Sequence, residues 1–129
     1  MKTVLITDCS SGFGYLAAKY LAEQGHHVIA SMRNVGGKNA GSATELKDFG
    51  SSNGYKLDVV EIDVTSDDSV NTAAANLPTV DVLINNAGLG YGGAMEAFSS
   101  EAVTAQLDLN IVGTVRMSQA VLPGMRAQK

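Results

Sequence analysis

The chain has 129 residues, 45% of them hydrophobic and 17% charged, with a formal net charge of −4. This length fits one domain with a proper core and is too short for two ordinary ones, so we expect a single domain over residues 1–129. The acidic balance excludes nonspecific nucleic-acid binding, and no apolar run approaches the roughly 18 residues that cross a bilayer.

The first half of the chain alternates short apolar runs with helical patterns. A Val- and Ile-containing run predicts a strand at Thr3–Thr7, and a helix at Gly12–Gln24 follows it, closed by Gly25 as a C-terminal glycine should. A second strand is expected at His27–Met32 and a second helix at Ser42–Phe49. A loop rich in glycine and asparagine separates these two elements.

The second half repeats the alternation. It predicts a strand at Tyr55–Val64, a helix at Asp67–Leu77 that a proline stops, a strand at Val80–Asn85 and a long helical stretch at Ser100–Gln128. An internal glycine and an internal proline predict a kink or a break in this last helix. The order βαβαβαβα implies a parallel sheet with right-handed crossovers and helices on both faces.

The turn Thr7–Gly14 joins the first strand to the first helix. A strand, a glycine-bearing turn and a helix start form a phosphate site for dinucleotides, because the backbone comes close and free N–H groups point at the anion. Such a turn also occurs as a plain structural connection. Asp8 stands where the first glycine is usual. Facing a pyrophosphate about 5 Å away, at an effective dielectric of about 20, it would cost about 3 kcal/mol; turned aside to cap an N–H, it would cost little.

Arg33 follows the second strand and bears on the choice of cofactor. An acidic residue at this place accepts hydrogen bonds from the ribose 2′-OH, whereas an arginine accommodates a 2′-phosphate. The sequence has no Asp or Glu between Gln24 and Glu45. Arg33, helped by Ser11 and Lys38, therefore favours NADP(H) over NAD(H), the alternative being a solvated loop arginine.

Three further features accompany the turn and Arg33. Asp63-Val64 ends the third strand, Asn85-Asn86-Ala87-Gly88 ends the fourth, and Asn110 lies in the last helix. In this order and spacing, the whole chain resembles the short-chain dehydrogenase/reductase family. The resemblance implies a Rossmann-like, doubly wound parallel sheet of strand order 3-2-1-4. It also implies an NADP(H)-dependent oxidoreductase that transfers hydride to or from a small-molecule carbonyl or alcohol substrate.

The resemblance also assigns roles to residues. The turn residues would contact the phosphates, the pair ending the third strand would bind the adenine edge, and the residues ending the fourth would line the adenosine ribose. The cofactor-binding residues so implied are Thr7, Ser10, Ser11, Gly12, Phe13, Gly14, Arg33, Asp63, Val64, Asn86, Ala87 and Gly88. Asn110 would be the catalytic helix asparagine, which orders a water in the proton relay.

The family's serine and its Tyr-x-x-x-Lys pair follow a fifth strand, and the sequence stops before them. Tyr15 and Lys19 have the spacing, but they lie on the first helix beside the phosphate turn, where they cannot reach the nicotinamide. Without a tyrosine acid and its lysine there is no proton donor. We therefore expect a cofactor-binding half that is inactive as given, or else a non-catalytic nucleotide-binding or self-associating module.

The remaining expectations concern single residues and surfaces. Cys9, the only cysteine, is expected to be a small packing residue rather than a reactive thiol, and a reduced, cytoplasmic protein without a metal site is expected. His26 and His27 are expected to be partly solvated. The fourth strand would be an apolar sheet edge, and the last helix is apolar around most of its circumference, which predicts a homo-oligomer.

Overall fold

A parallel sheet forms the centre of the computed structural model, which describes residues 1–128. β1 (Thr3–Ile6) pairs with β2 (His27–Met32) on one side and with β4 (Val82–Ile84) on the other, while β3 (Leu57–Glu61) pairs with β2. The order β3-β2-β1-β4 confirms the predicted doubly wound arrangement.

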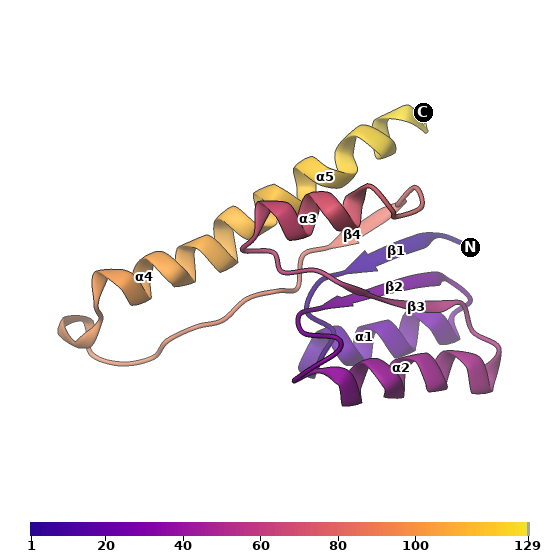
Figure 1. The fold of residues 1–129 in the computed structure, drawn as a ribbon, viewed down its shortest axis with the longest axis horizontal. Coiled ribbons are helices and arrows are strands. Elements are labelled where there is room, and N and C mark those ends of the chain that lie inside the picture. Colours follow the sequence, from indigo (N-terminus) through magenta and orange to yellow (C-terminus); the bar gives the residue numbers. More distant parts are fainter. Residues whose placement is uncertain (129) are drawn as a thin grey trace.

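Helices cover both faces of the sheet. α1 (Gly12–Glu23) and α2 (Ala40–Asn53) pack on one face, and α3 (Asp67–Ala74) and α5 (Gly113–Ala127) lie on the other (Figure 1). Because both faces are covered, all six residues of β2 are buried. Alternate strand residues therefore feed two separate apolar clusters, one beneath each pair of helices.

The segment from α2 to β3 differs most from the predicted bounds. α2 is longer than the expected Ser42–Phe49, because small residues that are typical of loops pack closely here: a Cβ on Gly50 would lie 3.1 Å from the Cβ of Leu57. Gly54, at φ 69°, ends the helix in the left-handed conformation. Tyr55 then packs on Phe49 with ring centroids 5.5 Å apart. β3 begins at Leu57, later than expected. The bounds of the remaining strands and of α1 and α3 agree to within three residues.

The expected long helix is divided. α4 (Ser100–Leu107) runs into a π-helical turn, η2 (Asp108–Val112), and α5 begins at Gly113. The break therefore falls before the glycine, and Pro123 lies inside α5. A short 3₁₀ turn, η1 (Met95–Ala97), precedes α4. No helix within residues 1–128 is long and apolar enough to span a membrane.

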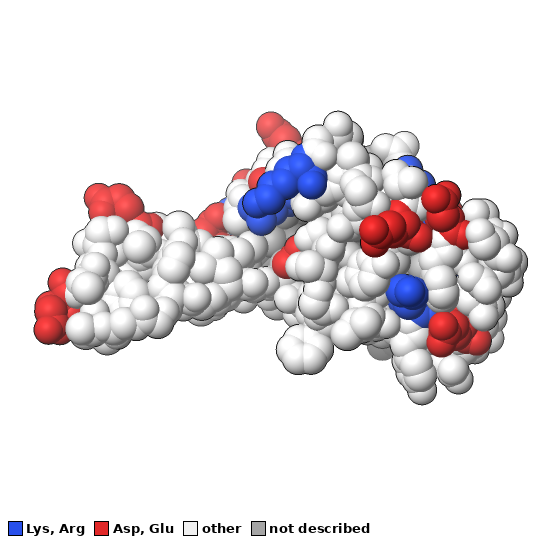
Figure 2. All heavy atoms as spheres, turned by 90° about the horizontal axis from the view of Figure 1, so that it is seen from below, with Lys and Arg blue, Asp and Glu red and all other residues white. Residues whose placement is uncertain are grey.

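The chain after β4 leaves the body of the molecule. It runs out as an extended segment and returns through α4, which projects as an arm beyond the sheet (Figure 1). Seen from the side of α1 and α2, the arm is largely uncharged, with acidic side chains near its tip (Figure 2). Apolar side chains are exposed along α4, η2 and α5: Val103, Leu107, Ile111, Val112, Val115 and Leu122.

Candidate cofactor-binding site

The turn after β1 is tied to the end of β4. Thr7 is buried, and its Oγ1 accepts hydrogen bonds from the backbone N–H groups of Asn86 (2.9 Å) and Ala87 (2.8 Å). The N–H of Cys9 donates to the carbonyl of Ser31 at 2.8 Å, which adds a link to β2. Sequence reasoning assigned Thr7 to the turn motif, and the structure shows that its hydroxyl fixes two strand ends together.

Gly14 allows the first helix to begin directly against this turn. The side-chain amide of Asn86 donates to the carbonyls of Thr7 (2.9 Å) and Asp8 (3.0 Å). A Cβ on Gly14 would collide with the Asp8 carbonyl and lie 2.6 Å from Asn86 Nδ2. Gly12 has φ +59°, a left-handed conformation that suits glycine. The two glycines therefore serve different ends, one close packing and the other backbone conformation.

Asp8 adopts the backbone expected of the glycine that it replaces, with φ 56°. Its Oδ1 accepts a hydrogen bond from the Ser10 hydroxyl at 3.2 Å. The side chain thus turns toward a hydroxyl rather than an N–H group, while the residue still lines the pocket described next. The structure combines features of both expected arrangements, since the carboxylate has a partner and remains at the site.

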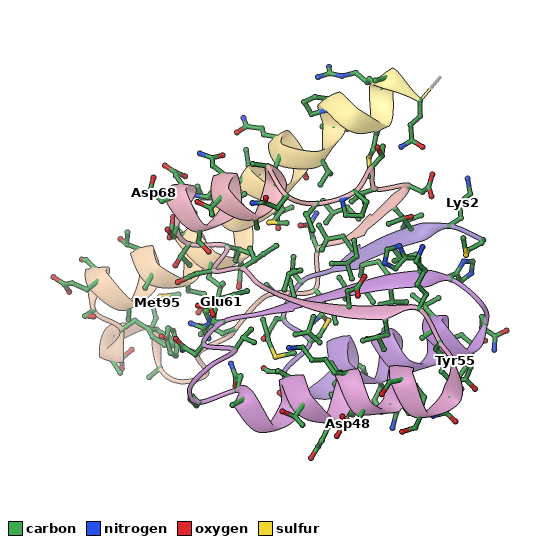
Figure 3. All side chains as sticks on the ribbon, turned by 45° about the vertical axis from the view of Figure 1, so that its right-hand side comes forward. Lys2, Asp48, Tyr55, Glu61, Asp68 and Met95 are labelled. Carbon is green, nitrogen blue, oxygen red and sulfur yellow. The ribbon has the colours of Figure 1, made fainter. Side chains whose placement is uncertain are left out.

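A pocket opens where the carboxyl ends of the four strands meet. Its lining comes from every strand end and from η2: Asp8, Met32, Arg33, Ile62, Val64, Ala87, Gly88, Leu89 and Leu109. Figure 3 shows Glu61, the last residue of β3, at this end of the sheet, and Lys2, just before β1, at the opposite end. The structure brings four of the predicted residues into this lining, and it leaves Ser10 and Ser11 on the neighbouring turn and Phe13 at the start of α1.

Arg33 lies at the rim, on a loop held by several hydrogen bonds. Asn39 Nδ2 donates to the Arg33 carbonyl at 2.6 Å, and the N–H of Val35 donates to Glu61 Oε2 at 3.3 Å. Asn34 has φ 51°, a left-handed conformation that asparagine tolerates. These contacts fix the loop backbone, while the arginine side chain stays exposed to solvent.

Asp63 lies next to the pocket, at the end of the segment after β3. Its Oδ1 accepts hydrogen bonds from the N–H (2.9 Å) and hydroxyl (2.7 Å) of Thr65. Burial raises the pKa of Asp63, but these hydrogen bonds and the charges of Arg33 and Arg116 outweigh it, so that the pKa lies below its ordinary value. The carboxylate is therefore an ionised hydrogen-bond acceptor beside the pocket.

Asn110 lies in the π-helical turn and holds the segment after Gly88. Its Oδ1 accepts from the N–H of Leu89 at 2.9 Å, and its Nδ2 donates to the carbonyl of the same residue at 2.7 Å. The Asn110 carbonyl accepts from the hydroxyl of Thr114 at 3.1 Å. The amide side chain thus spans the main chain between β4 and the arm.

The Tyr15–Lys19 pair connects the first two helices. The Tyr15 hydroxyl donates to Glu45 Oε2 at 3.1 Å, and Lys19 Nζ lies 4.4 Å from the centre of the Phe49 ring. Burial and the neighbouring Glu45 raise the pKa of Tyr15, which is the opposite of what a tyrosine proton donor needs. The pair is a contact between α1 and α2, away from the pocket.

Two other candidates are also settled by their surroundings. Cys9 is fully buried, its Sγ lies 3.4 Å from the Ile6 carbonyl, and burial raises the pKa of the thiol to about 12, so it is a packing residue as expected. The expectation that His27 is partly solvated is wrong: it is buried at the start of β2, with Nε2 2.7 Å from Asp58 Oδ2. Within residues 1–128, no group of three or more metal-ligating side chains gathers.

Sequence reasoning missed the residues that fasten η2 to the site. Arg116 on α5 donates hydrogen bonds to the carboxylates of Asp67 and Asp108 and to the carbonyl of Val64, which lines the pocket. These partners lie 8 to 52 positions away in sequence, so no local spacing could reveal them. Leu109, which lines the pocket, could have been found from the sequence only by its place directly before Asn110.

The sheet order and the pocket at the strand ends define an α/β domain of the Rossmann type. Residues 2–129 match the family described as short chain dehydrogenase, and the chain belongs to the short-chain dehydrogenase/reductase family.

Similar proteins extend well beyond the matched region. Human retinol dehydrogenase 8 is 40% identical over 132 residues, which cover 99% of this chain and 41% of the relative. Human 17-beta-hydroxysteroid dehydrogenase type 1 is 41% identical over 128 residues, covering 95% of this chain and 38% of the relative. A gluconate 5-dehydrogenase from Burkholderia cenocepacia, solved with NADP and tartrate, superposes with a TM-score of 0.86 at 29% identity, covering 98% of this chain and 49% of that one. The chain thus spans less than half the length of these relatives.

Proposed function

We propose that this chain is the NADP(H)-binding part of an oxidoreductase that moves hydride between the cofactor and a small-molecule carbonyl or alcohol. The observation that carries the proposal is Arg33 at the rim of the strand-end pocket, on a loop without any Asp or Glu before Glu45. A guanidinium at this place pairs with a 2′-phosphate, whereas an NAD(H) site has a carboxylate there. The gluconate 5-dehydrogenase complexed with NADP supports the cofactor class.

The pocket suits the adenosine part of such a cofactor. Met32, Ile62, Val64 and Leu109 provide apolar walls for a base, and the Asp63 carboxylate beside them accepts hydrogen bonds. The pyrophosphate would lie at the start of α1, where the first N–H groups of the helix are free. We propose these contacts for Ser10, Ser11 and the backbone of Phe13.

Asp8 lowers the affinity of this site in the proposal. Its carboxylate lies at the pocket and would repel the cofactor phosphates, with an upper cost of about 3 kcal/mol at about 5 Å. The hydrogen bond from Ser10 turns the carboxylate aside and reduces this cost. The chain should therefore bind NADP(H), but less tightly than a variant with glycine at position 8.

Residues 1–129 alone should not turn over a substrate. The one Tyr-x-x-x-Lys of the sequence, Tyr15 to Lys19, is engaged between α1 and α2. Asn110 would order a water for a proton relay, but this relay needs a tyrosine acid at the nicotinamide. A cytoplasmic location belongs to the same proposal, supported by a lone free thiol.

A self-associating module is the second candidate, favoured by the exposed apolar surfaces. β4 forms one edge of the sheet, and Val82 on it is 39% exposed. The apolar residues along α4, η2 and α5 offer another face. We propose a homo-oligomer through one of these surfaces. Sedimentation of the chain as a single monomeric species at micromolar concentration would contradict it.

The test of the cofactor proposal removes the arginine. Arg33→Ala should weaken NADPH binding by about tenfold or more, the worth of one charge-assisted contact to a phosphate, and leave NADH binding unchanged. Lys47→Ala, an exposed cation on α2, is the matched control and should change neither. Equal losses of NADPH and NADH in Arg33→Ala would show that the arginine does not read the 2′-phosphate.

A further inference from the structure

One arginine joins three separate elements behind the pocket. Arg116 lies on α5, its side chain is 18% exposed, and its Nε donates to Asp67 Oδ1 at 2.6 Å. Its Nη2 donates to Asp108 Oδ1 at 2.9 Å, and its Nη1 donates to the carbonyl of Val64 at 3.1 Å. All three guanidinium nitrogens therefore have partners, from α3, from η2 and from the turn after β3.

Two of these partners belong to segments that form the pocket. Val64 lines it from one side. Asp108 is the first residue of η2, whose next residue, Leu109, lines it from another. Arg116 is thus hydrogen-bonded to both segments at once, while its own side chain is not part of the lining.

Close packing reinforces this connection. Gly113, directly after η2, lies so near Val64 that an added Cβ would come within 2.8 Å of its Cγ2. The side chain and carbonyl of Val64 therefore pack directly against the helix backbone at Gly113. A π-helical turn lacks the regular hydrogen-bond spacing of an α-helix, so its position depends on contacts such as these.

We propose that Arg116 is a positioning residue for the nucleotide site: it fastens η2 to the Val64 turn and so sets the separation of two walls of the base pocket, Val64 and Leu109. This inference rests on the proposed function for the identity of the ligand. Asn110 also lies in η2, so Arg116 also stabilises the hydrogen bonds between the Asn110 amide and Leu89.

The two carboxylates contribute unequally. Asp67 is 77% exposed, and a pair so open to water contributes little. Asp108 is 35% exposed and is itself part of the π-helical turn. Hydrogen bonds to Asp108 and Asp67 raise the pKa of Arg116, so the guanidinium stays charged at the pH of the experiments. Asp108 is therefore the partner through which Arg116 acts on the pocket.

The test compares Arg116→Ala with Arg126→Ala, an arginine on the same helix without these partners. Hydrogen exchange of the backbone amides in Asp108–Val112 and NADPH affinity are measured well below the unfolding temperature. We expect Arg116→Ala to exchange at least about tenfold faster over Asp108–Val112 and to bind NADPH about fivefold more weakly, the loss of one to two hydrogen bonds. Arg126→Ala should match the wild type in both.

Further variants separate positioning from general stability. Asp108→Asn keeps the other two contacts of Arg116 and should reproduce part of both effects, whereas Asp67→Ala should reproduce neither. Should Arg116→Ala not fold, Asp108→Asn carries the test alone. Unchanged exchange over Asp108–Val112 would overturn the proposal, and so would faster exchange with unchanged NADPH affinity. If the wild type does not bind NADPH, the proposed function fails. Faster exchange in Arg116→Ala would then still support the part of the proposal in which Arg116 fastens η2 to the Val64 turn.

Discussion

Gly14 is the position where a single methyl group should disrupt the site. In Gly14→Ala the new Cβ would overlap the Asp8 carbonyl oxygen, lie 2.6 Å from Asn86 Nδ2 and 3.0 Å from the Asp8 carbonyl carbon. The backbone of the turn cannot yield easily, because Thr7 ties it to the end of β4. Overpacking of this kind costs about 1–3 kcal/mol. Displacing the Asn86 amide from two carbonyls adds about 1 kcal/mol for each hydrogen bond.

We therefore expect Gly14→Ala to lower the free energy of unfolding by about 3 kcal/mol. Two glycines provide controls. Gly12 has φ +59° and no atom within 4 Å of an added Cβ, so Gly12→Ala should cost only the left-handed strain of about 1–2 kcal/mol. Gly36 also has open space and no positive φ, so Gly36→Ala should be neutral.

Urea unfolding followed by circular dichroism gives these differences from the transition midpoints, provided that the slopes agree. The midpoint of Gly14→Ala should lie at a lower urea concentration than that of Gly12→Ala. The midpoint of Gly12→Ala should in turn lie below that of Gly36→Ala. A midpoint for Gly14→Ala equal to that of Gly36→Ala would refute the close approach of α1 to the turn.

Three shorter predictions concern neighbouring side chains. Asp8→Gly should tighten NADPH binding, by up to about a hundredfold if the full 3 kcal/mol of repulsion is relieved, and an unchanged dissociation constant in a titration would contradict this. Cys9 should resist Ellman's reagent in the folded protein at pH 8. Because burial raises its pKa from 9.0 to about 12, its stabilising contribution is complete below pH 9 and is lost as pH rises from 9 to about 12. The unfolding temperature of Cys9→Ala should therefore fall less steeply with pH over this range than that of the wild type. An equally steep fall in both proteins would contradict the raised pKa of the buried thiol. Tyr15→Phe should cost under about 1 kcal/mol, the worth of one exposed hydrogen bond, and leave NADPH affinity unchanged, whereas a large loss of affinity would tie the tyrosine to the site.

Much of the fold follows from the sequence because its apolar pattern has a clear period. β2 has the expected bounds because it is buried on both faces and flanked by polar residues. The residues after each strand meet in one pocket because parallel strands end on the same edge. Arg33, Asp63 and Gly88 each follow a different strand, and this order predicted that they lie near one another in the fold.

Other features depend on tertiary contacts that no local pattern contains. The length of α2 depends on Gly50 fitting against Leu57, although glycine and serine are typical of loops. At η2, where the last helix divides, Arg116 contacts Asp108 and the Val64 carbonyl, and Gly113 packs against Val64. The burial of His27 follows from a partner, Asp58, on the adjacent strand.

If Arg33 recognises a 2′-phosphate, as proposed, the chain distinguishes NADPH from NADH, and the ratio of the two affinities is the decisive measurement. Titration of the chain with each cofactor, followed by the fluorescence of the nicotinamide, gives both dissociation constants. We expect NADPH to bind at least about tenfold more tightly than NADH, a difference of about 1.4 kcal/mol. Equal or tighter binding of NADH would contradict it.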